Sequence, residues 1–253
     1  MSRRRGLFRG SSNPMMNEKM FQKAGQQTLD GHFLDVSEKM TVQGAINKSF
    51  ILGAIMLATA LVGYIMPSPL FMWGGASAGL IVVIIAARNP QRSGTLAPIY
   101  AALEGLFVGA VSAMYASFFD GIIFQAVSLT MAVFFMMLFI YKTGIIKVTN
   151  KFRTGVIMAT GAVLLVYVVN IVLSLFGVNV PFLHEGGAIG IGISLVIIGI
   201  ASMNLLLDFD NFEKGEQYGA PAYMEWFSAM GLLITLVWLY IEILRLIALL
   251  SRD

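Results

Sequence analysis

The long stretches without a charged residue constrain the fold of this chain most strongly. No Asp, Glu, Lys or Arg occurs in four of them, which are residues 49–87, 121–141, 154–184 and 186–207. A membrane-spanning helix needs roughly 20 mostly apolar residues, so each stretch holds at least one such helix. Charged residues form only 12% of the chain, against about a quarter in soluble proteins. The sequence therefore predicts an all-α integral membrane protein.

Turn signals divide the apolar runs into individual helices, most clearly at Pro67-Ser68-Pro69. Glu104 interrupts the third run, but an acid that faces the interior of a bundle is tolerated in a membrane. We predict a membrane domain over 49–250 with seven transmembrane helices at 49–66, 70–87, 98–118, 121–141, 154–176, 187–207 and 224–250.

A basic extension precedes this domain over residues 1–48. Residues 1–14 have the composition of a disordered tail, with four arginines and no apolar run. Residues 15–27 fit either a helix lying on an anionic membrane surface or a further disordered segment. Lys and Arg are concentrated in this extension and in the predicted loops 88–98, 142–153 and 208–223, and the alternate loops have none. This asymmetry predicts a cytoplasmic N-terminus and a C-terminus outside.

The residue types exclude several classes of function. The chain has no cysteine, and its only histidines are His32 and His184, so a thiolate site, a histidine metal cluster and a buried Ser-His pair are not expected. There is no phosphate-binding glycine motif followed by lysine. The net charge of +3 arises in tails and loops between apolar runs, so we expect no nucleic-acid partner, and we expect no enzyme activity.

Carboxylates remain as the candidate functional groups. Six of the fourteen acidic residues lie between Asp208 and Glu242. Asp208 is predicted to end the sixth helix and Glu225 to begin the seventh, and Glu104 lies near the same end of the third. Three acids at one depth suit either a hard cation such as calcium, with Asp208 and Glu225 as the ligands, or a proton-sharing pair. Asp208 is the first candidate.

Each acid also has a plain structural interpretation. Asp210, a further candidate, and Glu216 fit a solvated loop. Glu225 fits an interfacial acid at the N-terminus of its own helix, where the helix dipole favours it. Glu104 fits a buried, protonated acid that is bonded to a neighbouring backbone group.

Glu242 and Arg245 lie three residues apart on one helical face, so a neutralised ion pair is their plain interpretation. Glu242 is expected beyond the bilayer centre. A direct contact with Asp208 would therefore require the seventh helix to begin late or to be displaced.

Several segments resemble one known family. These are Asn204-Leu-Leu-Leu-Asp208-Phe-Asp210-Asn-Phe-Glu213-Lys-Gly215, Pro221-Ala-Tyr-Met-Glu225-Trp226, Leu236-Val-Trp238-Leu-Tyr240-Ile-Glu242-Ile-Leu-Arg245, Met40-Thr-Val-Gln-Gly-Ala-Ile-Asn-Lys48 and Pro98-Ile-Tyr100-Ala-Ala-Leu-Glu104-Gly105. Together they are similar to the Bax inhibitor/YccA superfamily, also called the transmembrane BAX inhibitor motif family, and in particular to a bacterial branch with a long N-terminal extension.

The resemblance implies a seven-helix bundle in which the last helix is central. It also implies that an aspartate ending the sixth helix faces an aspartate on the seventh, as in members that act as pH-sensitive calcium leaks. Asp208 matches the first position. The second is Glu242 if the Leu-Tyr-Ile-Glu pattern is aligned, or Thr235 if Arg245 anchors the alignment, which leaves Glu225 or Glu104 as the partner. Asn204 and Arg245 are supporting polar residues.

The leading expectation is therefore a passive calcium or cation leak in a bacterial inner membrane, with lipid around it and Ca²⁺ as the possible ion. The alternative is a regulator that does not transport and that binds a membrane protein, such as a protease or a stress-response protein.

Overall fold

The computed structural model describes residues 39–176 and 187–251, and within these ranges seven spans are long and apolar enough to cross a membrane. The chain is therefore a multi-pass α-helical membrane protein, as predicted. In order along the chain, the elements are α2 (Val42–Ile65), η1 (Leu70–Gly74) with α3 (Gly75–Arg88), η2 (Pro90–Arg92) with α4 (Ser93–Ala116), α5 (Ile122–Thr143), α6 (Asn150–Leu175), α8 (Ala188–Gln217) and α9 (Tyr223–Leu250).

Local sequence signals set several of the helix ends. Thr41 caps α2, because its hydroxyl accepts a hydrogen bond from the Gly44 backbone N–H at 2.9 Å. Thr149 caps α6 in the same way. Glycines flank α5: Gly121 and Gly144 have φ values of 70° and 69°, which side chains with a Cβ rarely adopt.

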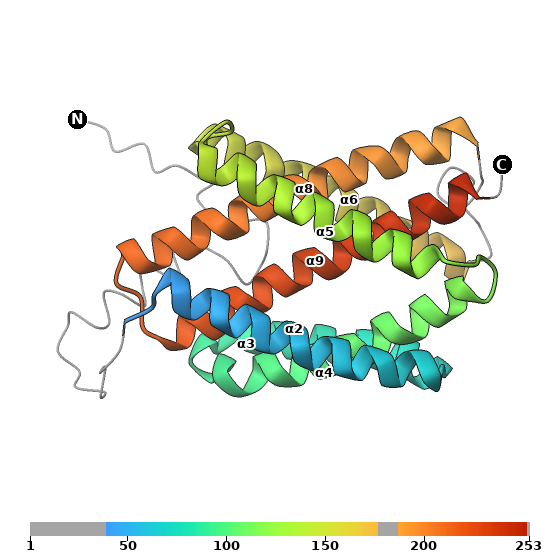
Figure 1. Cartoon of the computed structure of the whole chain (residues 1–253), viewed down its shortest axis with the longest axis horizontal. Helices are drawn as coiled ribbons and strands as arrows, with labels where there is room; N and C mark the ends of the chain where they lie inside the picture. Colours follow the sequence, from blue (N-terminus) through green and yellow to red (C-terminus); the bar gives the residue numbers. More distant parts are fainter. Residues whose placement is uncertain (1–38, 177–186, 252–253) are drawn as a thin grey trace.

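Helix α9 lies at the centre of the bundle. It passes between α2, α3 and α4 on one side and α5, α6 and α8 on the other (Figure 1). Of its most apolar 18-residue window, 67% is buried within the protein, against 50% for the next most buried span. The prediction that the last helix is central is confirmed.

Helices α2 and α4 approach each other closely along a run of glycines. A Cβ at Gly105 would lie 2.3 Å from the Met56 carbonyl oxygen, and one at Gly109 would lie 2.0 Å from the Ala60 carbonyl oxygen. Since lipid provides no hydrophobic driving force between helices, contacts of this kind between small residues provide much of the packing energy.

Two helix ends differ most from the predictions. Helix α2 begins at Val42 rather than at residue 49, so the end of the predicted extension is helical. Helix α8 continues to Gln217, ten residues beyond the predicted end at 207. Asp210 and Glu216 fitted a solvated loop, but they lie on α8 and bind partners on neighbouring elements, as described below. Residues 1–38, with the predicted basic tail and surface helix, lie outside the described residues.

Candidate functional site

Asp208 is buried inside the bundle, in the interior of α8 rather than at its end. Its side chain is 1% exposed. The Thr235 hydroxyl on α9 hydrogen-bonds its carboxyl group, and the positive charge of Arg153 on α6 acts on the same group. The second carboxyl oxygen, Oδ2, has no hydrogen-bond partner among the residues that the structure describes. An unpaired buried carboxyl oxygen is costly, which makes this group a candidate for a role other than packing.

Arg153 is the centre of a polar cluster between α6 and α8. It is 3% exposed, it forms an ion pair with Asp210, and its Nη1 donates to Asn211 Oδ1 at 2.9 Å. Asp210 also lies 3.1 Å from Lys214 Nζ. Asp210 is thus a bound partner of Arg153 and not a member of a solvated loop.

Arg153 was not among the predicted site residues, because the fifth predicted helix began at residue 154 and left Arg153 in the loop before it. The available signal was the Thr149 cap: an N-cap there starts α6 at Asn150 and places Arg153 inside its first turns. Besides Asp208 Oδ2, the cluster contains two buried donors, Arg153 Nε and Asn211 Nδ2, that have no partner within residues 39–176 and 187–251. Buried donors of this kind are usually satisfied by ordered water.

Asn204 lies one turn before Asp208 and ties α8 to α6. Its Nδ2 donates to Thr160 Oγ1 at 2.8 Å and to the Ile200 carbonyl at 2.9 Å. This bond helps to fix the rotation of α8, and hence the direction in which Asp208 points.

Glu242 and Arg245 form a second network with residues from α6 and α8. Arg245 Nη1 lies 3.7 Å from Glu242 Oε2, as the i,i+3 spacing predicted. The Tyr167 hydroxyl donates to Glu242 Oε1 and accepts from Arg245 Nη1 at 2.9 Å. Ser194 accepts from Arg245 Nη2 at 3.1 Å. Glu242 Oε2 has the ion pair but no hydrogen bond with any residue in the described part of the chain.

The network of Glu242 is separate from Asp208. Asp208 faces Thr235, and seven residues of helix separate Thr235 from Glu242, which is roughly 10 Å at the usual helical rise. Glu225 is ten residues before Thr235, or roughly 15 Å in the other direction. Thr235 is therefore the residue of α9 that faces Asp208, as in the alignment anchored on Arg245. Glu242 and Glu225 are both too far along α9 to contact Asp208.

Glu225 caps a different helix from its own. Its Oε1 accepts from the backbone N–H and the hydroxyl of Thr41, at 2.9 and 3.0 Å, and its Oε2 lies 3.7 Å from Lys48 Nζ. Glu216 on α8 accepts from the Val42 N–H at 3.1 Å. Two acids from α8 and α9 thus satisfy the free N–H groups at the start of α2, where the helix dipole favours negative charge.

We expect Glu225→Ala to lower the free energy of unfolding by about 1–2 kcal/mol, the usual cost of a lost N-cap. Thermal denaturation of the protein in detergent measures this change. Glu213→Ala is the matched control, since Glu213 is 41% exposed and its ion pair with Lys142 spans 3.9 Å; such pairs contribute little. Equal effects of the two substitutions would contradict the capping role.

Glu104 lies on the side of α4 that faces α3. It is hydrogen-bonded to Tyr100, and its Oε2 would be 3.0 Å from a Cβ at Gly79. The three acids predicted to share one depth therefore have three different sets of neighbours. Within the described ranges, no group of three His, Cys, Asp or Glu side chains is placed to hold a metal ion. The predicted calcium ligands Asp208 and Glu225 are not brought together.

Comparison with known proteins identifies one family. A family model described as Bax inhibitor 1 like matches residues 13–252. No curated protein and no solved structure matches the chain.

Proposed function

The chain belongs to the Bax inhibitor 1 like family, and from this premise we propose that it is a passive, pH-sensitive leak for calcium or a similar cation. In this proposal Asp208 is the proton-controlled group, and no enzymatic step is involved. We place the protein in a bacterial inner membrane because of its resemblance to the bacterial branch. In this placement the N-terminus is in the cytoplasm and the C-terminus outside, because Lys and Arg are concentrated in the N-terminal extension and in alternate loops.

The environment of Asp208 carries the proposal. A carboxyl group that is 1% exposed, with one unpaired oxygen, lies between α8 and the central helix. An ionised carboxylate in this position needs a counter-charge or water, whereas a protonated one packs as a neutral group. Gain or loss of the proton therefore changes what must lie between α8 and α9.

Arg153 takes the place of the second carboxylate in this mechanism. It is paired with Asp210 and also acts on Asp208. When Asp208 is protonated, Asp210 alone holds the guanidinium group. When Asp208 is ionised, Asp208 and Asp210 compete for the positive charge of Arg153. An incoming cation then neutralises Asp208 in place of part of the Arg153 charge. Cation entry and proton release are thus coupled at one residue.

Calcium flux into liposomes that contain the purified protein, measured from acid to neutral pH, tests this function. Because Asn is close in shape to protonated Asp, we expect Asp208→Asn to show one flux at every pH, equal to that of the wild type at acid pH. Glu213→Gln, at an exposed carboxylate, should keep the pH response of the wild type. A full pH response in Asp208→Asn would contradict the proposal, and so would no flux above empty liposomes.

A regulatory function that does not involve transport is the second candidate, and contacts of residues 39–41 favour it. The Met40 N–H donates to the Ala220 carbonyl at 2.7 Å, and Lys39 forms a bridge with Pro221. The chain that precedes α2 is therefore attached to the turn between α8 and α9. A partner bound to the extension, such as a membrane protease, would act on α9 through this attachment.

Deletion of residues 1–38 separates the two functions, because it keeps residues 39–41. A leak that depends on Asp208 should retain its flux and its pH response in the shortened protein. A regulator should lose its cellular effect. The same deletion in the Asp208→Asn background shows whether the two properties are independent.

A further inference from the structure

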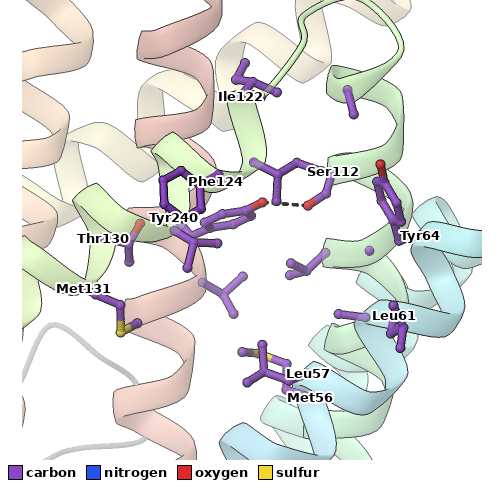
Figure 2. Close-up of a pocket in the computed structure, with 18 of the residues that line it drawn as sticks. Met56, Leu57, Leu61, Tyr64, Ser112, Ile122, Phe124, Thr130, Met131 and Tyr240 are labelled. Carbon is purple, nitrogen blue, oxygen red and sulfur yellow. Dashed lines mark hydrogen bonds between the residues drawn. The ribbon is translucent and has the colours of Figure 1, made fainter.

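A large apolar cavity lies apart from the carboxylate clusters. It has a volume of about 770 Å³ and is formed by α2, α4, α5, α9 and the turn between α4 and α5. Figure 2 shows Met56, Leu57 and Leu61 of α2 on one side and Tyr240 of α9 with Thr130 of α5 on the other. This volume lies in the range of about 300–1,000 Å³ that is typical of sites for small molecules.

The cavity opens toward lipid between α2 and α5. Its lining includes side chains of both helices that face outward from the protein, among them Leu57 at 66%, Leu61 at 59% and Phe124 at 79% exposure. All three belong to membrane-spanning segments, so the medium in contact with them is hydrocarbon. The cavity is thus continuous with the surface that the membrane already covers.

The extent of the cavity matches one leaflet of the bilayer. Along α5 and the turn before it, the lining runs from Asp120 to Met131, and along α2 it runs from Met56 to Tyr64. At the usual helical rise these segments are roughly 12–16 Å long. This length is similar to one leaflet of the bilayer, which is half of a hydrocarbon core about 30 Å thick. The cavity therefore extends from the membrane edge at the α4–α5 turn to near the midplane.

Polar groups lie at two levels of this cavity. In its wall the Ser112 and Tyr240 hydroxyls are 2.7 Å apart. One of the two donates to the other, and the proton of the accepting hydroxyl has no acceptor among the described residues, so it can donate to a further group. At the rim, the exposed Asp120 carboxylate is the charged group, and the described lining contains no Lys or Arg.

We propose that this cavity binds one acyl chain of a membrane phospholipid that enters between α2 and α5. The chain fills the apolar volume, since a cavity lined by apolar groups excludes water and loses dispersion contacts when it is empty. The free hydroxyl proton of the Ser112–Tyr240 pair suits a carbonyl acceptor. The Asp120 rim suits an ammonium headgroup, as in phosphatidylethanolamine, better than a purely anionic one.

Photo-crosslinking with a phospholipid that carries a diazirine on its acyl chain tests the proposal in vesicles. Val237 and Tyr240 of α9 line the cavity and are only 6% and 8% exposed, so lipid around the outside of the protein does not reach them. We expect mass spectrometry to find the label on this part of α9 in the wild-type protein. Labelling only on outward-facing residues would overturn the proposal.

Two tryptophan substitutions on α5 provide the matched comparison. Val127 lines the mouth and is 43% exposed, whereas Leu129, at 48%, does not line the cavity. Val127→Trp should fill the mouth and abolish the label on Val237 and Tyr240, and Leu129→Trp should retain it. Equal labelling of α9 in both variants would contradict an acyl chain in the cavity. The thermal denaturation midpoint of each variant shows whether it is folded.

The headgroup preference has its own test. Labelling of α9 should be stronger with a phosphatidylethanolamine probe than with a phosphatidylglycerol probe that has the same acyl chains. Asp120→Asn should remove this difference and keep the labelling. If the two probes label the wild type equally, the ammonium part of the proposal is wrong and the acyl chain part is tested by the tryptophan pair alone.

Discussion

Gly109→Ala is expected to destabilise the protein by about 3 kcal/mol, at the upper end of the usual cost of overpacking. The added Cβ would lie 2.0 Å from the Ala60 carbonyl oxygen and 2.8 Å from the Tyr64 nitrogen. Both are backbone atoms, so no side-chain rotation relieves the contact, and α2 and α4 must move apart. Chemical denaturation in detergent or bicelles, followed by circular dichroism, measures the loss.

Gly161→Ala on α6 is the control for this substitution. A Cβ at Gly161 has no neighbour within 4 Å, and alanine has a higher helix propensity than glycine by about 1 kcal/mol. We therefore expect Gly161→Ala to be neutral or stabilising. If Gly109→Ala were as well tolerated as Gly161→Ala, this result would contradict the close contact between α2 and α4.

Arg153→Leu is expected to cost about 3 kcal/mol, at the lower end of the usual cost of removing one partner from a buried ion pair. The substitution leaves Asp210 without its guanidinium partner and Asn211 Oδ1 without its donor. Lys214 remains 3.1 Å from Asp210 and moderates the loss. Lys151→Leu, at an exposed position on the same helix, should change stability by less than about 0.5 kcal/mol.

A double substitution tests whether Arg153 acts through Asp210. When both charges are removed, neither is left buried without a partner. Arg153→Leu with Asp210→Asn should therefore be less destabilising than the sum of the two single changes. Strict additivity in the denaturation measurements would show that the pair is not coupled. The proposed function adds a second readout, since Arg153→Leu should also shift the pH response of the flux.

The glycine contacts show what a local sequence pattern predicts about helix packing. The four-residue spacing of Gly105 and Gly109 is visible in the sequence, and both glycines do lie against α2. The same spacing occurs at Gly75 and Gly79, where Gly75 lies against α4 and Gly79 against the end of Glu104. The pattern identifies a helix face that allows close approach, but it does not name the neighbour.

The partners of the acidic residues could not be predicted from the local sequence. Asp208 was predicted to end a helix, and Asp210 and Glu216 fitted a solvated loop, but in the structure all three lie on α8. They have different partners: Thr235, Arg153 and the N-terminus of α2. Each partner comes from a distant part of the chain. From its charge alone, an acidic side chain is expected to be exposed to water. In the folded protein, a cation or the N-terminus of a neighbouring helix can stabilise the same charge without water.

Local sequence information is sufficient to predict the membrane class, the seven spans and the family, because hydropathy over about 20 residues and local motifs are properties of consecutive residues. Three further contacts appear only in the folded protein: Thr235 faces Asp208, the buried Arg153 acts on it, and Glu225 caps α2. Those contacts depend on the rotation and vertical offset of each helix about the central α9. Hydropathy is insensitive to both, because lipid and a neighbouring helix are equally apolar surroundings.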